Sequence, residues 1–472
     1  MNRRDEIIIE ADSHRLEFGE SLHDSIMEAI YTDASRIASR SVTKKGTKEI
    51  PNIDRIIDKI VTSKWLGFPI MFLMLSLVFW LTVEGANYPS AMLASLLVDM
   101  GHPFMKELFV SIGIPSWING LLIDGGYLAM AWVIAVMLPP MAIFFPVYTF
   151  LEDFGYLPRV SFNMDSLYRR AGAHGKQALT TAMGFGCNAA GVVATRVIDS
   201  PREKLIAIIT NNFSLCNGRW PTQILIASIF IGVLVPSHLV GLVTAGAVVF
   251  VALLGIFLSL VVSWALSKTV LKGESSAFTL ELPPYRPPRI LQTIYTALID
   301  RTIFILWRAI LFAFPAGLVI WLVANIFVGD QSIAVHFINF TDPFSLFIGL
   351  NGVILLAYII AIPANEIVIP TILMLTVMSA GLTGVGGGEG VMFELDSANM
   401  TRDILIAGGW TTLTAVNLML FSLLHNPCST TIYTIYKETR SVKWTVLASV
   451  LPVVMGLIVC FFVAQFWRLF AG

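Results

Sequence analysis

The chain has 472 residues, of which 56% are hydrophobic and only 13% are charged, whereas an ordinary soluble domain has about 25% charged residues. This composition predicts a polytopic membrane protein and excludes an ordinary soluble domain. The net charge of -1 is unlike that of basic nucleic-acid-binding proteins, so we expect no nucleic-acid partner. The four cysteines, outside a short secreted context, predict no disulfide framework.

Residues 1–64 form a charged segment that differs from the rest of the chain. The stretch LHDSIMEAIYTDASRIA, residues 22–38, has the periodicity of an amphipathic helix, and KKGTKEIPNIDRIIDKI, residues 44–60, reads as a linker into a second helix. The N-terminus lacks the uninterrupted apolar core of a cleaved signal peptide. We expect a cytoplasmic helical lead and linker that is too small to be an enzyme.

Apolar runs long enough to cross a hydrocarbon core, which takes about 20 helical residues, recur along the remaining chain. About eight candidate spans are found: Leu66 to Gly85, Gly126 to Phe150, Leu205 to Leu234, Val240 to Leu266, Ile303 to Val328, Leu346 to Met378, Ile404 to Leu424 and Trp444 to Phe466. Several contain proline or glycine, which predicts broken or re-entrant helices. We therefore predict an all-α membrane protein with a first membrane half (65–267), a cytoplasmic linker (268–301) and a second membrane half (302–472).

The positions of basic residues predict which segments face the cytoplasm. Lysines and arginines collect around residues 159–176, in 268–301 and in 437–443, whereas 87–124 and 329–343 hold almost none and are expected to face outward. Eight full crossings would place 437–443 outside, so at least one long segment must re-enter. The glycine-rich stretch 381–400 is expected to be a flexible acidic loop.

Two cysteine motifs show a weak internal correspondence. When Cys187 is laid on Cys428, a basic residue follows nine positions after each cysteine, a serine four positions later and a second basic residue two positions after that. Transporters are often built from repeats whose interrupted helices form a substrate site near the bilayer midplane. We therefore expect the two motifs to be half-helices of a repeat, with chance similarity as the alternative.

Polar side chains inside apolar segments are the candidate site residues, because they are costly in a membrane. Three of the four cysteines lie within two residues of an asparagine, in Cys187-Asn188, Cys216-Asn217 and Asn426-Pro427-Cys428. Cys460 has only apolar neighbours and fits the alternative for any cysteine, which is that it simply fills space.

Two carboxylates and one histidine complete the set of candidates. Glu366 lies in the proline-broken IPANEIVIP, where backbone carbonyls lose their helical donors. Glu152 follows an apolar span, and an interfacial helix end is the alternative role for it. His425 is close to Cys428, although a role at a helix end is the preferred interpretation. Thiolates, amide oxygens, carboxylates and free carbonyls together form a ligand set for a borderline divalent metal.

The motifs resemble the membrane domain of the FeoB ferrous-iron transporter family. The resemblance runs from about residue 53 to the C-terminus and rests on motifs that occur in order: LEDFGYLPRVSFNMDSLYRRAGAHGK, GFGCNAAGVVATRVIDSPREKLIAIITNNFSLCNGRWP, LELPPYRPPR, NEIVIPTI and NPCSTTIYTIYKETRSVKW. It implies two gate motifs, around Cys187 and Cys428, and ferrous iron as the transported ion, with no permanently bound cofactor. The implied metal-contacting residues are Cys187, Cys216, Cys428, Glu152 and Glu366, and we expect Asn188 and Asn217 to add amide oxygens.

The sequence also departs from the family pattern. The usual GFGCNVP is GFGCNAA here, and the usual Lys-Glu pair is Asn365-Glu366, which removes a positive charge. The G-protein domain of the family is missing, because the only Gly-Lys pair, Gly175-Lys176, is followed by Gln177 and forms no phosphate loop. We expect no enzyme activity and a separately encoded soluble GTPase that docks on the lead and the basic loops; a truncated chain is the alternative.

The sequence thus predicts a multi-pass permease of the prokaryotic cytoplasmic (inner) membrane that imports a divalent metal, with the lipid bilayer and a GTPase as partners. Two other functions stay open at this point. One is transport of a nucleoside-like solute, because gate motifs also occur in nucleoside-recognition membrane proteins. The other is a non-transporting scaffold or metal sensor for a GTPase. A homo-oligomer with a pore between protomers is a second arrangement that the sequence permits.

Overall fold

The protein is almost entirely helical, as expected. The computed structural model describes residues 22–41, 53–63, 65–236, 238–272, 285, 289–382, 384, 390–395 and 397–471. Within these residues the two strands β1 (Phe327–Val328) and β2 (Gln331–Ser332) pair antiparallel, and the other regular elements are helices. The predicted linker at 44–52, residues 273–284 and 286–288 of the predicted linker at 268–301, and residues 383, 385–389 and 396 of the predicted acidic loop lie outside the described residues.

The first half of the chain contains long apolar helices separated by a stretch of short ones. In chain order the helices are α2 (Leu22–Ser41), α3 (Ile53–Val61), α4 (Gly67–Ala94), η2 (Ser95–Gly101), α5 (His102–Ser111), α6 (Ser116–Asn119), η3 (Gly120–Tyr127), α7 (Leu128–Asp153), α8 (Tyr156–Arg170), α9 (Gln177–Gly186), α10 (Asn188–Ala194), η4 (Thr195–Val197), α11 (Pro201–Thr210), η5 (Asn211–Phe213), η6 (Asn217–Arg219), α12 (Trp220–Ile226), η7 (Ala227–Ile231), η8 (Gly232–Leu234) and α13 (Val240–Lys268).

The second half has a similar mixture of long and short helices. Its helices are α14 (Ile290–Thr296), η9 (Ala297–Ile303), α15 (Phe304–Asn325), α16 (Ile333–Phe347), α17 (Gly352–Ile360), η10 (Asn365–Ile367), α18 (Val368–Ser379), α19 (Ala398–Ala407), α20 (Thr412–Leu424), α21 (Ser429–Thr439) and α22 (Val442–Ala471). The amphipathic helix predicted at residues 22–38 is confirmed as α2, and the second helix of the lead is confirmed as α3.

The described residues contain five helices long and apolar enough to cross a bilayer, or up to seven when each of two sharply bent pairs is counted as one span. The sequence predicted about eight. The interval 205–234 is the clearest overcount, because it is divided among α11, η5, η6 and α12 to η8. The expectation of broken or re-entrant helices is confirmed by two sharp bends. One lies between α16 and α17 (113°), and the other lies between α19 and the segment Thr412–Thr439, which contains α20 and α21 (108°).

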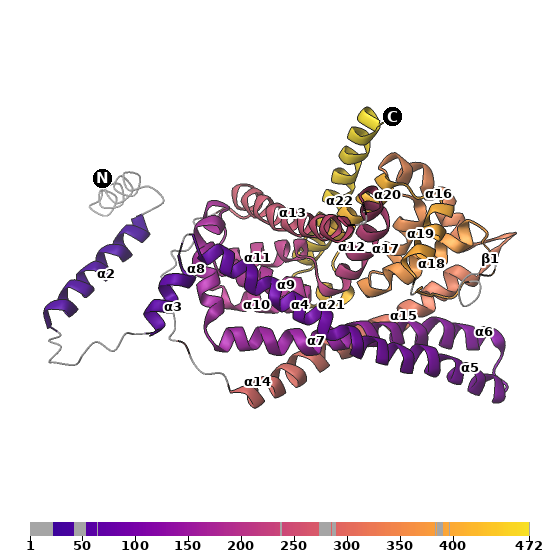
Figure 1. Ribbon diagram of the computed structural model, residues 1–472, viewed down its shortest axis with the longest axis horizontal. Helices are drawn as coiled ribbons and strands as arrows, with labels where there is room; N and C mark the ends of the chain where they lie inside the picture. The colour runs from indigo at the N-terminus through magenta and orange to yellow at the C-terminus, as the bar shows by residue number, and fades with distance from the viewer. Residues whose placement is uncertain are drawn as a thin grey trace, which may run out of the picture.

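The first two long helical segments form a hairpin that packs against α15 (Figure 1). The first runs from Gly67 to Ser111, well beyond the predicted span 66–85, so the predicted outward segment at 87–124 is helical rather than a loop. The buried Asp124 carboxylate joins the two arms of the hairpin, because it accepts from Lys106 Nζ at 2.8 Å and lies 2.7 Å from His102 Nε2. Gly317 of α15 lies against Gly125, so the two backbones approach closely.

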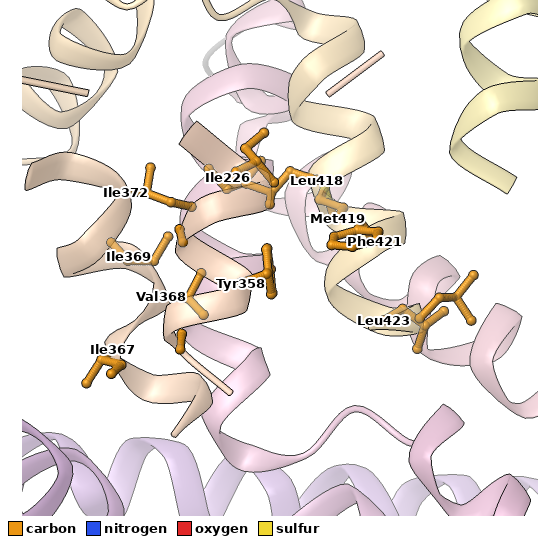
Figure 2. Packing of buried hydrophobic residues seen from close by; sticks show 14 of the residues in the cluster. Ile226, Tyr358, Ile367, Val368, Ile369, Ile372, Leu418, Met419, Phe421 and Leu423 are labelled. Carbon is orange, nitrogen blue, oxygen red and sulfur yellow. The ribbon is translucent and has the colours of Figure 1, made fainter. Parts of the chain in front are cut away.

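A second packing region lies among the shorter helices. Figure 2 shows apolar side chains of α12, α17, α18 and α20 gathered there, including Ile226, Tyr358, Ile372 and Leu418. These side chains are buried in the larger of the two apolar cores. The short helices are therefore held by tertiary packing, because isolated helices of this length are not stable in water.

The basic segments predicted to be cytoplasmic are tied to one another. Asp58 of α3 accepts from Arg159 of α8 at 3.0 Å and from Tyr285 of the linker at 2.9 Å. Arg202 of α11 donates to the carbonyls of Gly172 and Leu271. The bent segments bring the end of α21 to α10 and α11, where Glu438 meets basic side chains.

The close approach of Gly317 to Gly125 predicts a strong effect of a single methyl group. A Cβ atom on Gly317 would lie 2.2 Å from the Gly125 carbonyl oxygen, so Gly317→Ala should force α15 away from η3 and cost about 1–3 kcal/mol. A lower unfolding midpoint in detergent would show this. Gly246→Ala in α13, where a Cβ meets nothing within 4 Å, is the matched control and should be neutral or stabilising. Equal midpoints for the two variants would contradict the prediction.

Candidate metal site at four chain breaks

Four interruptions of helical structure, called the four breaks below, lie next to the predicted site residues. They are Cys187 between α9 and α10, residues 214–216 between η5 and η6, residues 361–364 between α17 and η10, and residues 425–428 between α20 and α21. Cys187 has extended backbone angles (φ -151°, ψ 121°). All three motif cysteines directly precede a helix, and the repeat that relates Cys187 to Cys428 stays a prediction.

Small residues let the first break approach its neighbours. A Cβ atom on Gly186 would lie 2.1 Å from the ring of Phe144 in α7, and one on Gly191 would lie 2.3 Å from Asn211 Oδ1. Glycine is therefore required on both sides of Cys187 for α9 and α10 to pack against α7 and η5. This explains the glycines at positions 186 and 191.

Hydrogen bonds connect the first break to the second and the second to the fourth. Asn211 Nδ2 donates to the Asn188 carbonyl at 2.8 Å, and Asn212 Nδ2 donates to the His425 carbonyl at 2.7 Å. The carboxamide of Asn188 is itself buried and lies 3.2 Å from Asn212 Oδ1. Adjacent asparagines in η5 thus satisfy backbone oxygens on two other breaks, which apolar surroundings would otherwise leave without partners.

The third break joins the second and the fourth in the same way. Asn365 Nδ2 donates to Cys216 Sγ at 3.7 Å, and Ser429 N donates to the Ile362 carbonyl at 2.9 Å. A Cβ atom on Gly218 would lie 2.3 Å from Glu366 Oε1, so the carboxylate reaches the loop that carries Cys216. The four breaks therefore form one connected cluster.

The three motif thiols and the Glu366 carboxylate lie within electrostatic range of one another. Cys428 interacts with Cys216 and Glu366, and Cys187 interacts with the other two thiols. Cys216 is buried, Cys187 and Cys428 are partly buried, and the Cys428 thiol is 3.2 Å from Thr431 Oγ1. Such a set can supply sulfur and carboxylate ligands to a borderline metal ion.

In this conformation the cluster is closed. No group of three or more histidine, cysteine, aspartate or glutamate side chains within the described residues is arranged to hold a metal ion. Cys187 and Asn217 line the same cavity, whose volume is about 10 Å³, which is space for at most about one water molecule. This cavity is therefore too small for a hydrated ion, and binding of one by these side chains would require a rearrangement.

Glu152 lies apart from this cluster. α7 ends at Asp153, followed by Gly155 in the left-handed conformation (φ 86°), and Glu152 is exposed at that end. It lines a separate cavity of about 510 Å³ together with Arg196 and Arg308. The structure therefore brings Cys187, Cys216, Cys428, Glu366, Asn188 and Asn217 together but not Glu152.

Arg219 is a central residue that the sequence analysis did not identify. Its side chain is 1% exposed, and its guanidinium donates to the carbonyls of Asn212, Leu423, His425 and Asn426 and to Asn212 Oδ1, at 3.0–3.4 Å. The available signal was its charge, because Arg219 is the only Asp, Glu, Lys or Arg between Lys204 and Lys268. It stabilises the second and fourth breaks together.

The other ends of the two half-helices are also connected. α10 packs against α21, and Glu438 at the end of α21 accepts from Arg196 Nη2 at 2.6 Å and from Lys204 Nζ at 3.2 Å. The Glu438 side chain is 6% exposed. By contrast, Lys176 pairs with an Asp199 side chain that is 89% exposed, and this hydrogen bond holds the pKa of Asp199 below its usual value.

Substitution of Arg219 should destabilise the whole cluster. Arg219→Lys leaves one ammonium group where a planar guanidinium reaches five acceptors, and each buried carbonyl left without a donor costs about 1–3 kcal/mol. We expect a loss of at least about 2 kcal/mol in stability, measured as a lower unfolding midpoint in detergent. Arg169→Lys, at a half-exposed arginine that pairs with Asp165, is the control. A midpoint for Arg219→Lys equal to that of the control would contradict the assigned role.

Removal of the Glu438 charge should loosen α10 and α21 at their shared end. Hydrogen bonds to charged groups contribute about 1.5–3 kcal/mol, so Glu438→Gln should speed amide hydrogen exchange near residues 188–197 and 429–439 by about tenfold or more. Asp199→Asn removes an exposed pair that contributes about 0–1 kcal/mol and should change exchange little. Equal exchange in the two variants would show that Glu438 does not hold the helices together.

Comparisons with known proteins agree with these motifs. Residues 134–230 match the Gate model, described as nucleoside recognition, and residues 248–300 match FeoB_C, described as the C terminus of ferrous iron transport protein B. The Gate match contains the first two breaks, whereas Cys428 lies outside both matched ranges. No solved structure matches the chain.

Several curated relatives are similar over most of the chain. A Staphylococcus aureus protein named Fe(2+) transporter FeoB is 29% identical over 417 residues, which cover 88% of this chain and 59% of the relative. A Campylobacter jejuni protein of the same name is 25% identical over 445 residues, covering 90% and 67%. A Porphyromonas gingivalis fusion of Fe(2+) transport protein A with Fe(2+) transporter FeoB is 26% identical over 478 residues, covering 92% and 54%.

The chain therefore spans about three fifths of the length of the first relatives that it matches. Together the two matched models, the relatives and the ordered motifs make this chain similar to the FeoB family over most of its length.

Proposed function

We propose that this chain forms the membrane path through which ferrous iron enters the cytoplasm of a prokaryotic cell. The observation that carries this proposal is the convergence of Cys187, Cys216, Cys428 and Glu366 at four breaks in apolar helices. The names of the relatives support iron as the substrate. The chemistry of the cluster supports a divalent cation, because sulfur and oxygen ligands together suit borderline metals.

The physical reason for such a cluster is the cost of dehydration. The transfer of one unit charge from water into a medium of low dielectric costs on the order of 20 kcal/mol in the Born picture, and a double charge about four times as much. Protein ligands must therefore replace the hydration shell as the ion leaves water. The proposed replacement ligands are the thiols, the carboxylate and the asparagine amides that lie beside the four breaks.

A soluble GTPase is the proposed partner for opening the path. The 472 residues contain no phosphate-loop sequence, so nucleotide hydrolysis must be supplied by a domain or protein outside them. The proposed docking surface for the GTPase consists of the basic segments that contain α8, α11 and the end of α21, together with α3. The fused relative also supports a small protein of the Fe(2+) transport protein A type as a second partner.

Uptake into proteoliposomes tests the proposed path. Cys428→Ser and Glu366→Gln each remove a ligand, and we expect Fe²⁺ uptake to fall about 10-fold to 100-fold, since loss even of outer-shell partners has effects of this size. Cys460→Ser is the matched control, because that thiol is buried away from the cluster and donates to the Asn417 carbonyl. Fe²⁺ uptake equal to that of the control in both variants would remove these residues from the path.

The same liposomes separate the alternative functions. Uptake of a nucleoside, inhibited by other nucleosides and unaffected by metal ions, would replace iron with the solute class that the Gate description names. A wild-type protein that binds iron but gives no flux, with or without a GTPase and GTP, would indicate a metal sensor or scaffold rather than a permease.

A further inference from the structure

A buried histidine lies within the four breaks and has an arrangement that the proposed path does not yet use. His425 Nδ1 lies 2.8 Å from the Ser422 carbonyl oxygen, and His425 Nε2 lies 3.0 Å from Asn365 Oδ1. The other end of the Asn365 amide reaches Cys216 Sγ at 3.7 Å. His425 and Asn365 are 2% and 4% exposed, and Cys216 is 9% exposed. The amide therefore lies between an imidazole nitrogen and a thiol.

The contact at Nδ1 determines the chemistry of the other ring nitrogen. A carbonyl oxygen only accepts hydrogen bonds, so Nδ1 carries the proton that it donates to Ser422. In a neutral imidazole Nε2 then has a free lone pair. A histidine whose other ring N–H donates to a backbone carbonyl is also the usual arrangement of a metal-binding histidine, since that bond fixes the tautomer and the ring orientation.

The Asn365 oxygen is an unfavourable partner for the lone pair of His425 Nε2, because both atoms are hydrogen-bond acceptors. In the arrangement described above Asn365 presents its oxygen to Nε2, so two acceptors face each other at 3.0 Å. A turn of the amide would relieve this contact, and so would a cation between His425 and Cys216. The Asn365 amide thus occupies the space in which a metal ion would meet one nitrogen and one sulfur ligand.

The imidazole is held firmly in this position. Its ring packs against the ring of Tyr358 with centroids 4.6 Å apart, and its backbone carbonyl accepts from Asn212 and Arg219. By contrast, Asn365 begins the three-residue helix η10 at the third break, where its amide bridges two partners. The side chain that can move most easily is therefore the amide and not the imidazole.

We infer that His425 Nε2 is a nitrogen ligand for the transported cation, and that the Asn365 amide holds the cation's place in the closed conformation. This inference rests on the proposed function, because it assumes that the four breaks take up a divalent metal. It adds imidazole to the thiols and Glu366, and a mixed nitrogen, sulfur and oxygen set suits ferrous iron and its neighbours in the first transition row. Entry of the ion requires the amide to swing away.

Cobalt binding to the full chain in lipid nanodiscs tests the inference, since Co²⁺ reports its ligands through visible absorption bands. His425→Asn keeps a donor near the position of Nδ1 and removes the Nε2 ligand. We expect Co²⁺ affinity to fall about tenfold or more and the bands of the remaining complex to move to lower energy, because an oxygen donor is a weaker-field ligand than imidazole. His336→Asn, at an exposed histidine bound to the Val328 carbonyl, should change neither.

A second variant tests the place-holding role of the amide. Asn365→Ala empties the space between His425 and Cys216, so Co²⁺ should bind severalfold more tightly, which a purely structural role for Asn365 does not predict. This variant also decides the matter if His425→Asn fails to fold, as judged by size-exclusion elution and unfolding midpoint. Unchanged or weaker Co²⁺ binding in Asn365→Ala would then overturn the inference.

The outcomes separate this inference from the proposed function. Unchanged affinity and band energies in folded His425→Asn would overturn the inference, and so would a wild-type chain that takes up Fe²⁺ but gives no Co²⁺ spectrum. If the wild-type chain gives no metal flux but the His425→Asn variant loses Co²⁺ binding, the result supports His425 as a nitrogen ligand and contradicts transport by this chain.

Discussion

The structure depends on the need to satisfy backbone oxygens wherever a helix is interrupted inside apolar surroundings. Each break releases carbonyls that have no helical donor, and hydrocarbon offers none. The chain meets this need with buried side-chain donors, above all the Arg219 guanidinium, which serves the second and fourth breaks, and Asn212, which serves the fourth. Because the same few donors hold several breaks, the thiols beside those breaks are held in one cluster.

The use of arginine as a structural donor also sets the charge of the cluster. The guanidinium lies close to Cys216 and Glu366, and an ionised Glu366 would balance its charge while the thiols are protonated. A divalent cation would bring the positive total to three, which Glu366 and two thiolates would neutralise. Metal uptake by this set would therefore release protons from thiols, as expected for sulfur ligands. A neutral imidazole ligand would leave this balance unchanged.

Much of the cluster could be predicted from the sequence because its residues are conspicuous in apolar surroundings. A cysteine close to an asparagine indicated the first, second and fourth breaks, and the prolines around Glu366 indicated the third. Hydropathy alone misjudged residues 205–234, because it averages over Asn211 and Asn212, whose amides donate to backbone carbonyls beside other breaks. Glu152 lies outside the cluster, at the end of α7, and its role as a ligand or gate stays a prediction. The partners of Arg219 come from α20 and the loop after it, about two hundred residues away, and no local pattern predicts such contacts.

The two half-helices that begin at Cys187 and Cys428 offer a route from the proposed cytoplasmic face to the cluster. α21 has 11 residues, so it spans about 16 Å at 1.5 Å per residue, with the Cys428 thiol at one end and Glu438 at the other. α10 lies against it and is bound to Glu438 through Arg196. A soluble partner that binds this face can shift the thiols only if it prefers one arrangement of these helices over the other. The ion network at Glu438 is the place where such a preference would act, because it is the point at which both half-helices reach the surface together.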